Sequence, residues 1–162
     1  MAVRLVRESE WELARDARLR ALVESPAAFL STFAEEEGLG ADEWRERVHP
    51  GDRSAWFAES DGERFSGVIV VAFAEPDSGL ASLFSMWVDS ACRRRGIGRA
   101  LVEAALAWAA ERGALRVELE VNEEMHAARS LYETCGFSPT GRRRLLSPDS
   151  GAMAMQMMAR SG

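Results

Sequence analysis

The stretch "ACRRRGIGRAL", residues 91–101, places three arginines and two glycines directly before an apolar pattern of helical period. That pattern consists of Ile97, Leu101, Ala105 and Trp108, and it predicts a helix over 97–112. A helix N-terminus offers unpaired backbone N–H groups, and glycine lets a ligand approach them closely. The stretch is therefore either a phosphate-binding turn or a surface turn with three solvated arginines.

Two familiar phosphate-binding motifs do not fit this stretch. The dinucleotide fingerprint requires a third glycine, and that position holds Leu101. The P-loop requires a Gly-Lys-Ser/Thr sequence, and the chain contains no lysine. The absence of lysine also excludes a lysine Schiff base or a lysine nucleophile. Short glycine motifs are common, so the residues alone leave both readings open.

The elements around this stretch predict one domain over residues 1–162, with a mixed α+β fold. Strands are predicted over 2–7, 54–60, 65–74, 80–89, 115–121, 141–146 and 152–159, and helices from an N-cap at Ser9 to Glu24, then over 41–48, 97–112 and 125–134. The strand–helix–strand unit over 80–121 requires a parallel strand pair. Hairpins on either side predict antiparallel neighbours, so we expect a mostly antiparallel sheet flanked by helices.

Composition and charge exclude several classes of protein. The net charge of −6 at pH 7 argues against general binding to nucleic acid. The longest apolar run, 67–74, is too short to span a bilayer, and the N-terminus lacks the apolar core of a signal peptide. Cys92 and Cys135 have no metal-like spacing, so neither a zinc site nor a disulfide framework is expected. We expect a cytoplasmic protein that is not bound to a membrane.

Two motifs resemble the GCN5-related N-acetyltransferase (GNAT) superfamily over about residues 80–140. The first is the signature Arg/Gln-x-x-Gly-x-Gly/Ala, which matches Arg93, Gly96 and Gly98 within "MWVDSACRRRGIGRALVEAALAWAAERGA" at 86–114. The second is Ala-x-x-Leu-Tyr…Gly-Phe, and it matches Ala128, Leu131, Tyr132, Gly136 and Phe137. The two motifs stand in the family's order, separated by a helix and a strand. This resemblance favours the phosphate-binding reading of residues 91–101.

The resemblance implies a site for acetyl-CoA in a notch where the strands at 80–89 and 115–121 splay apart. The backbone of Met86 and Val88 is expected to bond the pantetheine arm, although plain strand packing would also explain both side chains. The pyrophosphate is expected on the turn and helix start, which comprise Arg93, Arg94, Arg95, Gly96, Ile97, Gly98 and Arg99. No metal is implied.

The resemblance also implies two catalytic residues. Tyr132, the only tyrosine, matches the family residue that protonates the leaving thiolate; the alternative is an aromatic that fills space between helix and sheet. Glu120 lies in "LEV" twelve residues earlier, as does the base of ribosomal-protein N-terminal acetyltransferases; the alternative is a solvent-facing glutamate. Strand alternation places Glu118, Glu120 and Asn122 on one face. Met125 departs from the family, which carries asparagine there, and Asn122 is a candidate substitute.

The resemblance implies direct transfer of an acetyl group to a primary amine of a small molecule or peptide. The cysteines lack a His/Asp constellation, so an acyl-enzyme is not expected. The alternative is a non-catalytic acyl-CoA-binding sensor. Candidates for an acceptor pocket are the aromatic residues Phe29, Phe33 and Trp44 and the acidic residues Glu35, Glu36 and Glu37, although core packing and solvation explain them as well. The acceptor's identity and the oligomeric state, a homodimer included, are left open.

Overall fold

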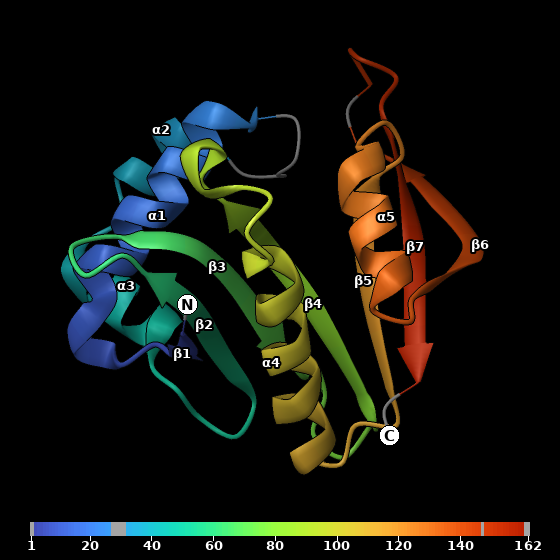
Figure 1. The fold of residues 1–162 in the computed structure, drawn as a ribbon, viewed down its shortest axis with the longest axis horizontal. Coiled ribbons are helices and arrows are strands. Elements are labelled where there is room, and N and C mark those ends of the chain that lie inside the picture. The colour runs from blue at the N-terminus through green and yellow to red at the C-terminus, as the bar shows by residue number, and fades with distance from the viewer. Residues whose placement is uncertain (1, 27–31, 147, 161–162) are drawn as a thin grey trace.

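The computed structural model describes residues 2–26, 32–146 and 148–160. Its strands are β1 (Val3–Leu5), β2 (Ser54–Ser60), β3 (Phe65–Ala72), β4 (Leu80–Val88), β5 (Arg116–Asn122), β6 (Ser138–Leu145) and β7 (Met153–Arg160). Its α-helices are α1 (Trp11–Glu24), α2 (Phe33–Glu37), α3 (Ala41–Val48), α4 (Ile97–Glu111) and α5 (His126–Thr134), and short 3₁₀ turns cover Glu8–Glu10 and Ser90–Cys92. The strands form one sheet in the order β1-β2-β3-β4-β5-β7-β6 (Figure 1).

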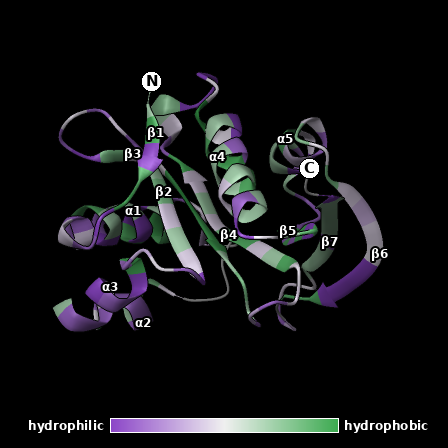
Figure 2. Cartoon of the chain, turned by 90° about the horizontal axis from the view of Figure 1, so that it is seen from below, coloured by the Kyte–Doolittle hydropathy of each residue, from purple (hydrophilic) through white to green (hydrophobic). Residues whose placement is uncertain are grey.

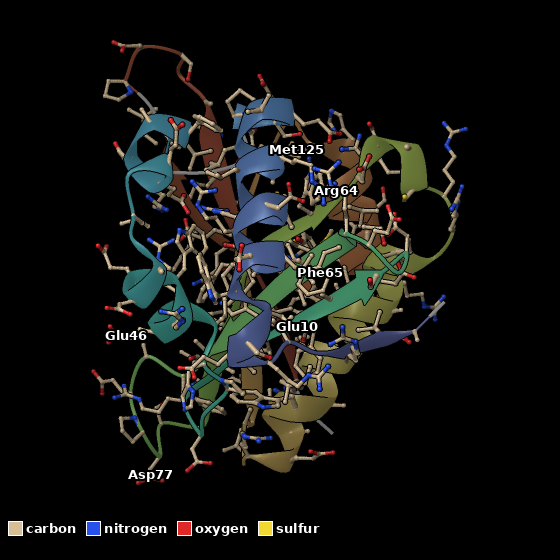
Figure 3. All side chains as sticks on the ribbon, turned by 90° about the vertical axis from the view of Figure 1, so that its left-hand side faces the viewer. Glu10, Glu46, Arg64, Phe65, Asp77 and Met125 are labelled. Carbon is tan, nitrogen blue, oxygen red and sulfur yellow. The ribbon has the colours of Figure 1, made fainter. Side chains whose placement is uncertain are left out.

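The sheet is covered by helices on both faces. Helices α4 and α5 lie on one face, and α1 to α3 lie on the other, over the half that contains β1 to β4 (Figure 2). Two apolar clusters follow from this arrangement. One joins α4 and α5 to strand residues such as Val117 and Leu119, and the other joins α1 and α3 to residues such as Trp56 and Phe65. Figure 3 looks onto α1, which crosses the sheet in front of Phe65. The predicted mixed α+β fold is therefore confirmed.

The parallel pair β4–β5 is joined only at its beginning. The paired residues are Leu80 with Arg116, Ala81 with Val117 and Ser82 with Glu118, after which the two strands separate (Figure 1). At the point of separation Ser85 has φ 58°, and the register of β4 against β3 shifts. A residue in the left-handed region within a strand marks a β-bulge, which bends the strand. The bulge in β4 accompanies its departure from β5, and the predicted splayed pair is confirmed.

The first helical segment begins differently from the prediction. Ser9 is not the N-cap, because the backbone N–H of Arg7 donates to Glu10 and a 3₁₀ turn precedes α1. Arg4 also donates two hydrogen bonds to the Glu10 carboxylate, at 2.8 and 2.6 Å, and so fixes this corner from β1. The helix ends at Glu24 as predicted, but Val23 is 67 % exposed and does not belong to its apolar face.

The other elements agree closely with the expected positions. The helices at 41–48 and 97–111 and the hairpin of β2 with β3 are confirmed. Strand β1 is limited to three residues, and β6 begins three residues earlier than the sequence pattern indicated. Helix α2 was missed, since five residues are too few to show a helical period. In the described residues, no helix combines the length and the apolar character needed to cross a bilayer.

Candidate active site

A cleft of about 1070 Å³ opens where β4 and β5 separate. Its walls include β4 from Ser82 to Val88, β5 from Glu118 to Asn122, and the N-terminal turn of α4. Residues from both faces of the sheet line it: Tyr132 comes from α5 on one face, and Arg18 comes from α1 on the other. The cleft therefore connects the two faces through the gap in the sheet.

The beginning of α4 presents free backbone amides to this cleft. Gly96 is the N-cap with φ 80°, a left-handed conformation that glycine adopts without a Cβ penalty. The first hydrogen bond of the helix runs from Ala100 N to Gly96 O, at 3.1 Å. The N–H groups of Ile97, Gly98 and Arg99 therefore have no acceptor within the helix. Together with the helix dipole, they make this end of the cleft suitable for an anion.

The arginines around this turn differ in their ion pairing. Arg93 donates to the carbonyl of Val88, at 3.1 Å, and forms an ion pair with Glu24 of α1. Arg99 forms an ion pair with Glu103 one helical turn away. Arg94, which lines the cleft, and Arg95, which is not among the lining residues, make no ion pair within the described parts of the chain. Arg94 is thus the cleft arginine at this turn whose charge is not compensated, and its φ of 66° is unusual for a residue with a side chain.

The edge of β4 beyond the splay is available for backbone hydrogen bonds. The N–H of Asp89 donates to Ser66 O in β3, so alternation points the N–H of Val88, and that of Met86 two residues earlier, toward β5. No β5 residue pairs with β4 there. The side chains of Met86 and Val88 pack beside Gly98, where an added Cβ would lie 3.8 Å from either. The backbone N–H groups of Met86 and Val88, rather than their side chains, are therefore directed at a ligand, whereas the Val88 carbonyl already accepts from Arg93.

Tyr132 lines the cleft from α5 and is 8 % exposed. Its ring packs edge-on against Phe137, with the ring centroids 5.9 Å apart. Burial, with a smaller effect of the nearby Cys135 thiol, raises the pKa of the Tyr132 phenol above its usual value. The hydroxyl group therefore keeps its proton throughout the physiological range, as a proton donor must.

Glu120 lies on the opposite face of the sheet from α5, as strand alternation predicted. Val117, Leu119 and Val121 are buried on the helix side, whereas Glu120 is exposed and forms an ion pair with Arg144 of β6. The partner Arg144 was not foreseen, because β6 is joined to β5 only through β7.

Strand alternation predicts that Glu118, two residues earlier, lies on the same face, but no motif assigns it a function. One of its carboxylate oxygens accepts a hydrogen bond from Ser82 Oγ at 3.2 Å, and the other accepts one from Gln156 Nε2 at 3.0 Å. Ser82 belongs to β4 and Gln156 to β7, so these contacts exist only in the assembled sheet. The sequence gives no signal that would have found them.

The described residues among the candidates for an acceptor pocket are not brought together. Trp44 is fully buried and packs edge-on against Trp56, since α3 lies on the sheet, so core packing, the alternative offered by the sequence, accounts for this residue. Glu36 is 2 % exposed and is bound by Arg18 and Arg47, so it is neither solvated nor a pocket lining. Phe33 is 37 % exposed and lies outside the main cleft.

Two further candidates, Glu35 and Glu37, are not among the residues that line the cleft. Glu35 and Glu37 are exposed on α2. Phe29 falls outside the described residues. On the sheet face that carries Glu118 and Glu120, the cleft is lined instead by residues such as Ser82, Phe84 and Gln156.

The beginning of α5 differs from the family pattern. Met125 is the N-cap and lines the cleft. Asn122, at the end of β5, is 7 % exposed, and its side-chain oxygen accepts a hydrogen bond from Glu124 N at 3.0 Å. Asn122 also lines the cleft, so it supplies an amide near the place where the family carries one.

The described residues hold no cluster of three or more His, Cys, Asp or Glu side chains that could bind a metal ion. Both cysteines are free thiols. Burial raises the pKa of the Cys135 thiol, which makes it a poorer nucleophile at neutral pH.

Comparison with known proteins agrees with this geometry. The profile of the acetyltransferase (GNAT) family matches residues 11–137. Because that match spans most of the 162 residues, the chain belongs to the GNAT family.

Curated relatives match smaller parts of the chain. Mycothiol acetyltransferase of Beutenbergia cavernae is 37 % identical over 86 residues, which are 52 % of this chain and 28 % of that protein. The [ribosomal protein bS18]-alanine N-acetyltransferase of Escherichia coli K12 is 36 % identical over 100 residues, which are 57 % of this chain and 68 % of that protein.

Solved structures show the same fold. A GNAT-family acetyltransferase from Streptococcus pneumoniae has a TM-score of 0.86 at 19 % identity, covering 99 % of both chains. The protein yncA of Salmonella typhimurium, solved with acetyl-CoA, has a TM-score of 0.80 at 15 % identity, covering 100 % of this chain and 94 % of that one.

Proposed function

We propose that this protein is an acetyl-CoA-dependent N-acetyltransferase that transfers an acetyl group to a primary amine of a small molecule or peptide. The observation that carries the proposal is the cleft through the splayed strands, which brings an anion-binding helix end, a buried protonated tyrosine and two carboxylates into one cavity. Membership of the GNAT family supports the same activity.

The residues present fit acetyl-CoA, which would supply the acetyl group as a thioester. Free amides at Ile97, Gly98 and Arg99 and the uncompensated charge of Arg94 suit its pyrophosphate. The unpaired backbone edge at Met86 and Val88 suits the amides of its pantetheine arm. Arg93 is not assigned to the pyrophosphate in this proposal. Its guanidinium forms an ion pair with Glu24 and so joins the turn to α1.

The chemistry requires two proton movements. As the lone pair of the amine attacks the thioester carbonyl, a C–N bond forms and the C–S bond breaks. Tyr132 gives its proton to the departing sulfur, and burial keeps that proton in place until then. A carboxylate on the acceptor face, directly or through water, takes the proton that the amine loses. Glu120 is the first candidate, and its ion pair with Arg144 holds it in position.

Mass spectrometry of products tests the activity. Purified protein is incubated with acetyl-CoA and a panel of amines and peptides, which includes the N-terminal alanine peptides suggested by the relative that acts on ribosomal protein bS18. An acetylated product with release of CoA is expected. Since the protein contains no lysine, any acetyl-lysine must belong to a substrate. Turnover of no amine in the panel, with acetyl-CoA bound and intact, would favour a sensor instead.

The sensor alternative rests on one observation. Met125 stands where the family carries asparagine, so one cofactor contact is replaced by an apolar side chain. Tyr132→Phe separates the two functions. An enzyme loses most of its turnover while acetyl-CoA binding is retained, whereas a sensor shows binding alone in both proteins.

A further inference from the structure

We propose that Glu118 is the anionic subsite that binds the acceptor as an ammonium ion, and that the acceptors of this enzyme are cationic amines with an apolar body. This inference rests on the proposed acetyl transfer and adds the chemical class of the acceptor and the residue that recognises it.

The first support is the ionic pairing of the residues that line the cleft. Its two lining carboxylates are Glu118 and Glu120. Glu120 is neutralised by Arg144. Glu118 makes no ion pair with any described residue, and its hydrogen-bond donors, Ser82 and Gln156, are both neutral. A partly buried carboxylate without a counter-ion favours a cation beside it.

The second support is the position of Glu118 in the sheet. It is the last β5 residue that pairs with β4, opposite Ser82, so its side chain stands at the point where the gap between the strands begins. Cleft residues on this acceptor face carry one further compensated charge, because Arg18 donates three hydrogen bonds to Glu36, at 3.0 to 3.1 Å. Glu36 is shared with Arg47, and Glu118 is therefore the lining carboxylate on this face that has no ion-pair partner among the described residues.

The third support is the way in which the carboxylate is held. Ser82 Oγ donates to one oxygen and Gln156 Nε2 to the other, so the group is oriented by residues of two other strands. Each carboxylate oxygen can accept more than one hydrogen bond. Acceptor capacity therefore remains for an ammonium N–H, and binding costs no reorientation of the side chain.

The apolar part of the acceptor has a surface beside this carboxylate. Phe84 lines the cleft and is 48 % exposed, although it lies in the middle of a strand. Alternation after buried Leu83 places Phe84 on the same face as Ser82. A half-exposed aromatic ring on the same face of the cleft as an uncompensated carboxylate suits an aralkyl or alkyl ammonium.

Binding of two probes of equal shape tests the proposal without turnover. Phenethylamine carries an ammonium at neutral pH, and 2-phenylethanol carries a neutral hydroxyl group. Each is titrated calorimetrically into wild-type protein saturated with CoA, and into Glu118→Gln, Glu120→Gln and Glu111→Gln. Glu111 is the matched control, since its side chain is 76 % exposed at the end of α4, away from the cleft.

We expect the wild-type protein to bind the ammonium at least about tenfold more tightly than the alcohol, and Glu118→Gln to abolish most of that preference. Glu111→Gln leaves it unchanged, and Glu120→Gln lowers it by less than Glu118→Gln does. The proposal is overturned if wild type shows no preference for the ammonium, or if Glu120→Gln removes as much of it as Glu118→Gln.

Two further measurements separate folding and catalysis from recognition. Thermal unfolding and CoA binding establish that Glu118→Gln is folded, and Gln156→Met, which removes one donor but keeps the charge, is expected to lower the preference only partly. In turnover assays Glu118→Gln raises KM for cationic acceptors more than it lowers kcat. Transfer that is insensitive to Glu118 refutes this inference alone, whereas absence of transfer to any amine refutes the proposed activity.

Discussion

Gly98 of α4 lies so close to Leu131 of α5 that a Cβ at position 98 would be 3.0 Å from Leu131 Cδ2. The helix that presents amides to the cleft and the helix that carries Tyr132 are therefore in direct contact. The second glycine of the arginine–glycine stretch is required for this approach rather than for an unusual φ, since its backbone is helical.

Gly98→Val is expected to push α4 and α5 apart at the cleft. Acetyl-CoA affinity should fall by about tenfold or more, because both helices contribute to the same cavity and overpacking costs about 1–3 kcal/mol. Ala107→Val is the matched control, since it introduces the same β-branched side chain at an exposed position of the same helix. Equal affinity of both variants and wild type for acetyl-CoA, measured by calorimetry, would contradict the prediction.

Gly96→Ala tests the left-handed N-cap. A Cβ in this conformation costs about 1 kcal/mol, so we expect lower stability together with weaker acetyl-CoA binding. Gly51→Ala should leave both properties unchanged, because Gly51 has no positive φ and its added Cβ would meet nothing within 4 Å. Denaturant unfolding measures the stability, and calorimetric titration measures the affinity for acetyl-CoA. If Gly96→Ala leaves both unchanged, the left-handed backbone at position 96 does not require glycine.

Arg94→Ala is expected to weaken acetyl-CoA binding and to reduce its dependence on salt, because the charge of Arg94 is not shared with a carboxylate in the described chain. Arg93→Ala should instead lower the unfolding free energy, since its guanidinium joins Val88 to Glu24. Arg142→Ala on the exposed strand β6 is the control for loss of one positive charge. If Arg93→Ala and Arg94→Ala affect binding alike at every salt concentration, the division of roles is wrong.

Tyr132→Phe should lower kcat strongly and leave KM for acetyl-CoA nearly unchanged. Because burial raises the pKa of Tyr132 in the folded protein, Tyr132 contributes stability that is complete below the unfolded pKa of about 10 and is lost as pH rises further. Wild-type protein should therefore lose more stability than the phenylalanine variant on alkaline titration above about pH 10. Parallel alkaline curves for the two proteins would contradict this assignment.

Glu10→Gln tests the corner between β1 and α1. The hydrogen bonds from Arg4 hold the pKa of Glu10 at about 2, well below its usual value, against the opposing effect of partial burial. The stabilisation is therefore present above the unfolded pKa of about 4.5 and is lost as pH falls toward about 2. We expect Glu10→Gln to be about 0.5–1 kcal/mol less stable than wild type at neutral pH, with most of that difference lost by pH 2. A difference that persists unchanged in acid would refute the ion pair as its source.

The local elements could be predicted because their signals lie within a few residues. The apolar period and the flanking glycines predict the helix over 97–111, and strict alternation of apolar and polar residues predicts β5. The start of α1 could not be predicted from Ser9. The Arg4 side chain and the backbone N–H of Arg7 both donate to the Glu10 carboxylate, and this contact with β1 fixes the start of the helix. For Trp44 the sequence left core packing and a pocket lining open, because the contact with Trp56 joins two segments that are distant along the chain.

The sequence by itself determined the fold class, the arginine–glycine turn at the start of a helix, and the face of β5 on which its carboxylates stand, because these depend on short-range periodicity and backbone conformation. Only the tertiary structure decided how the charges are shared. Glu120 meets Arg144, Arg93 meets Glu24, and Glu118 meets neutral groups from two other strands. Those pairings depend on strand order and on the point where β4 leaves β5, and contacts between residues so distant along the chain arise only when the sheet assembles.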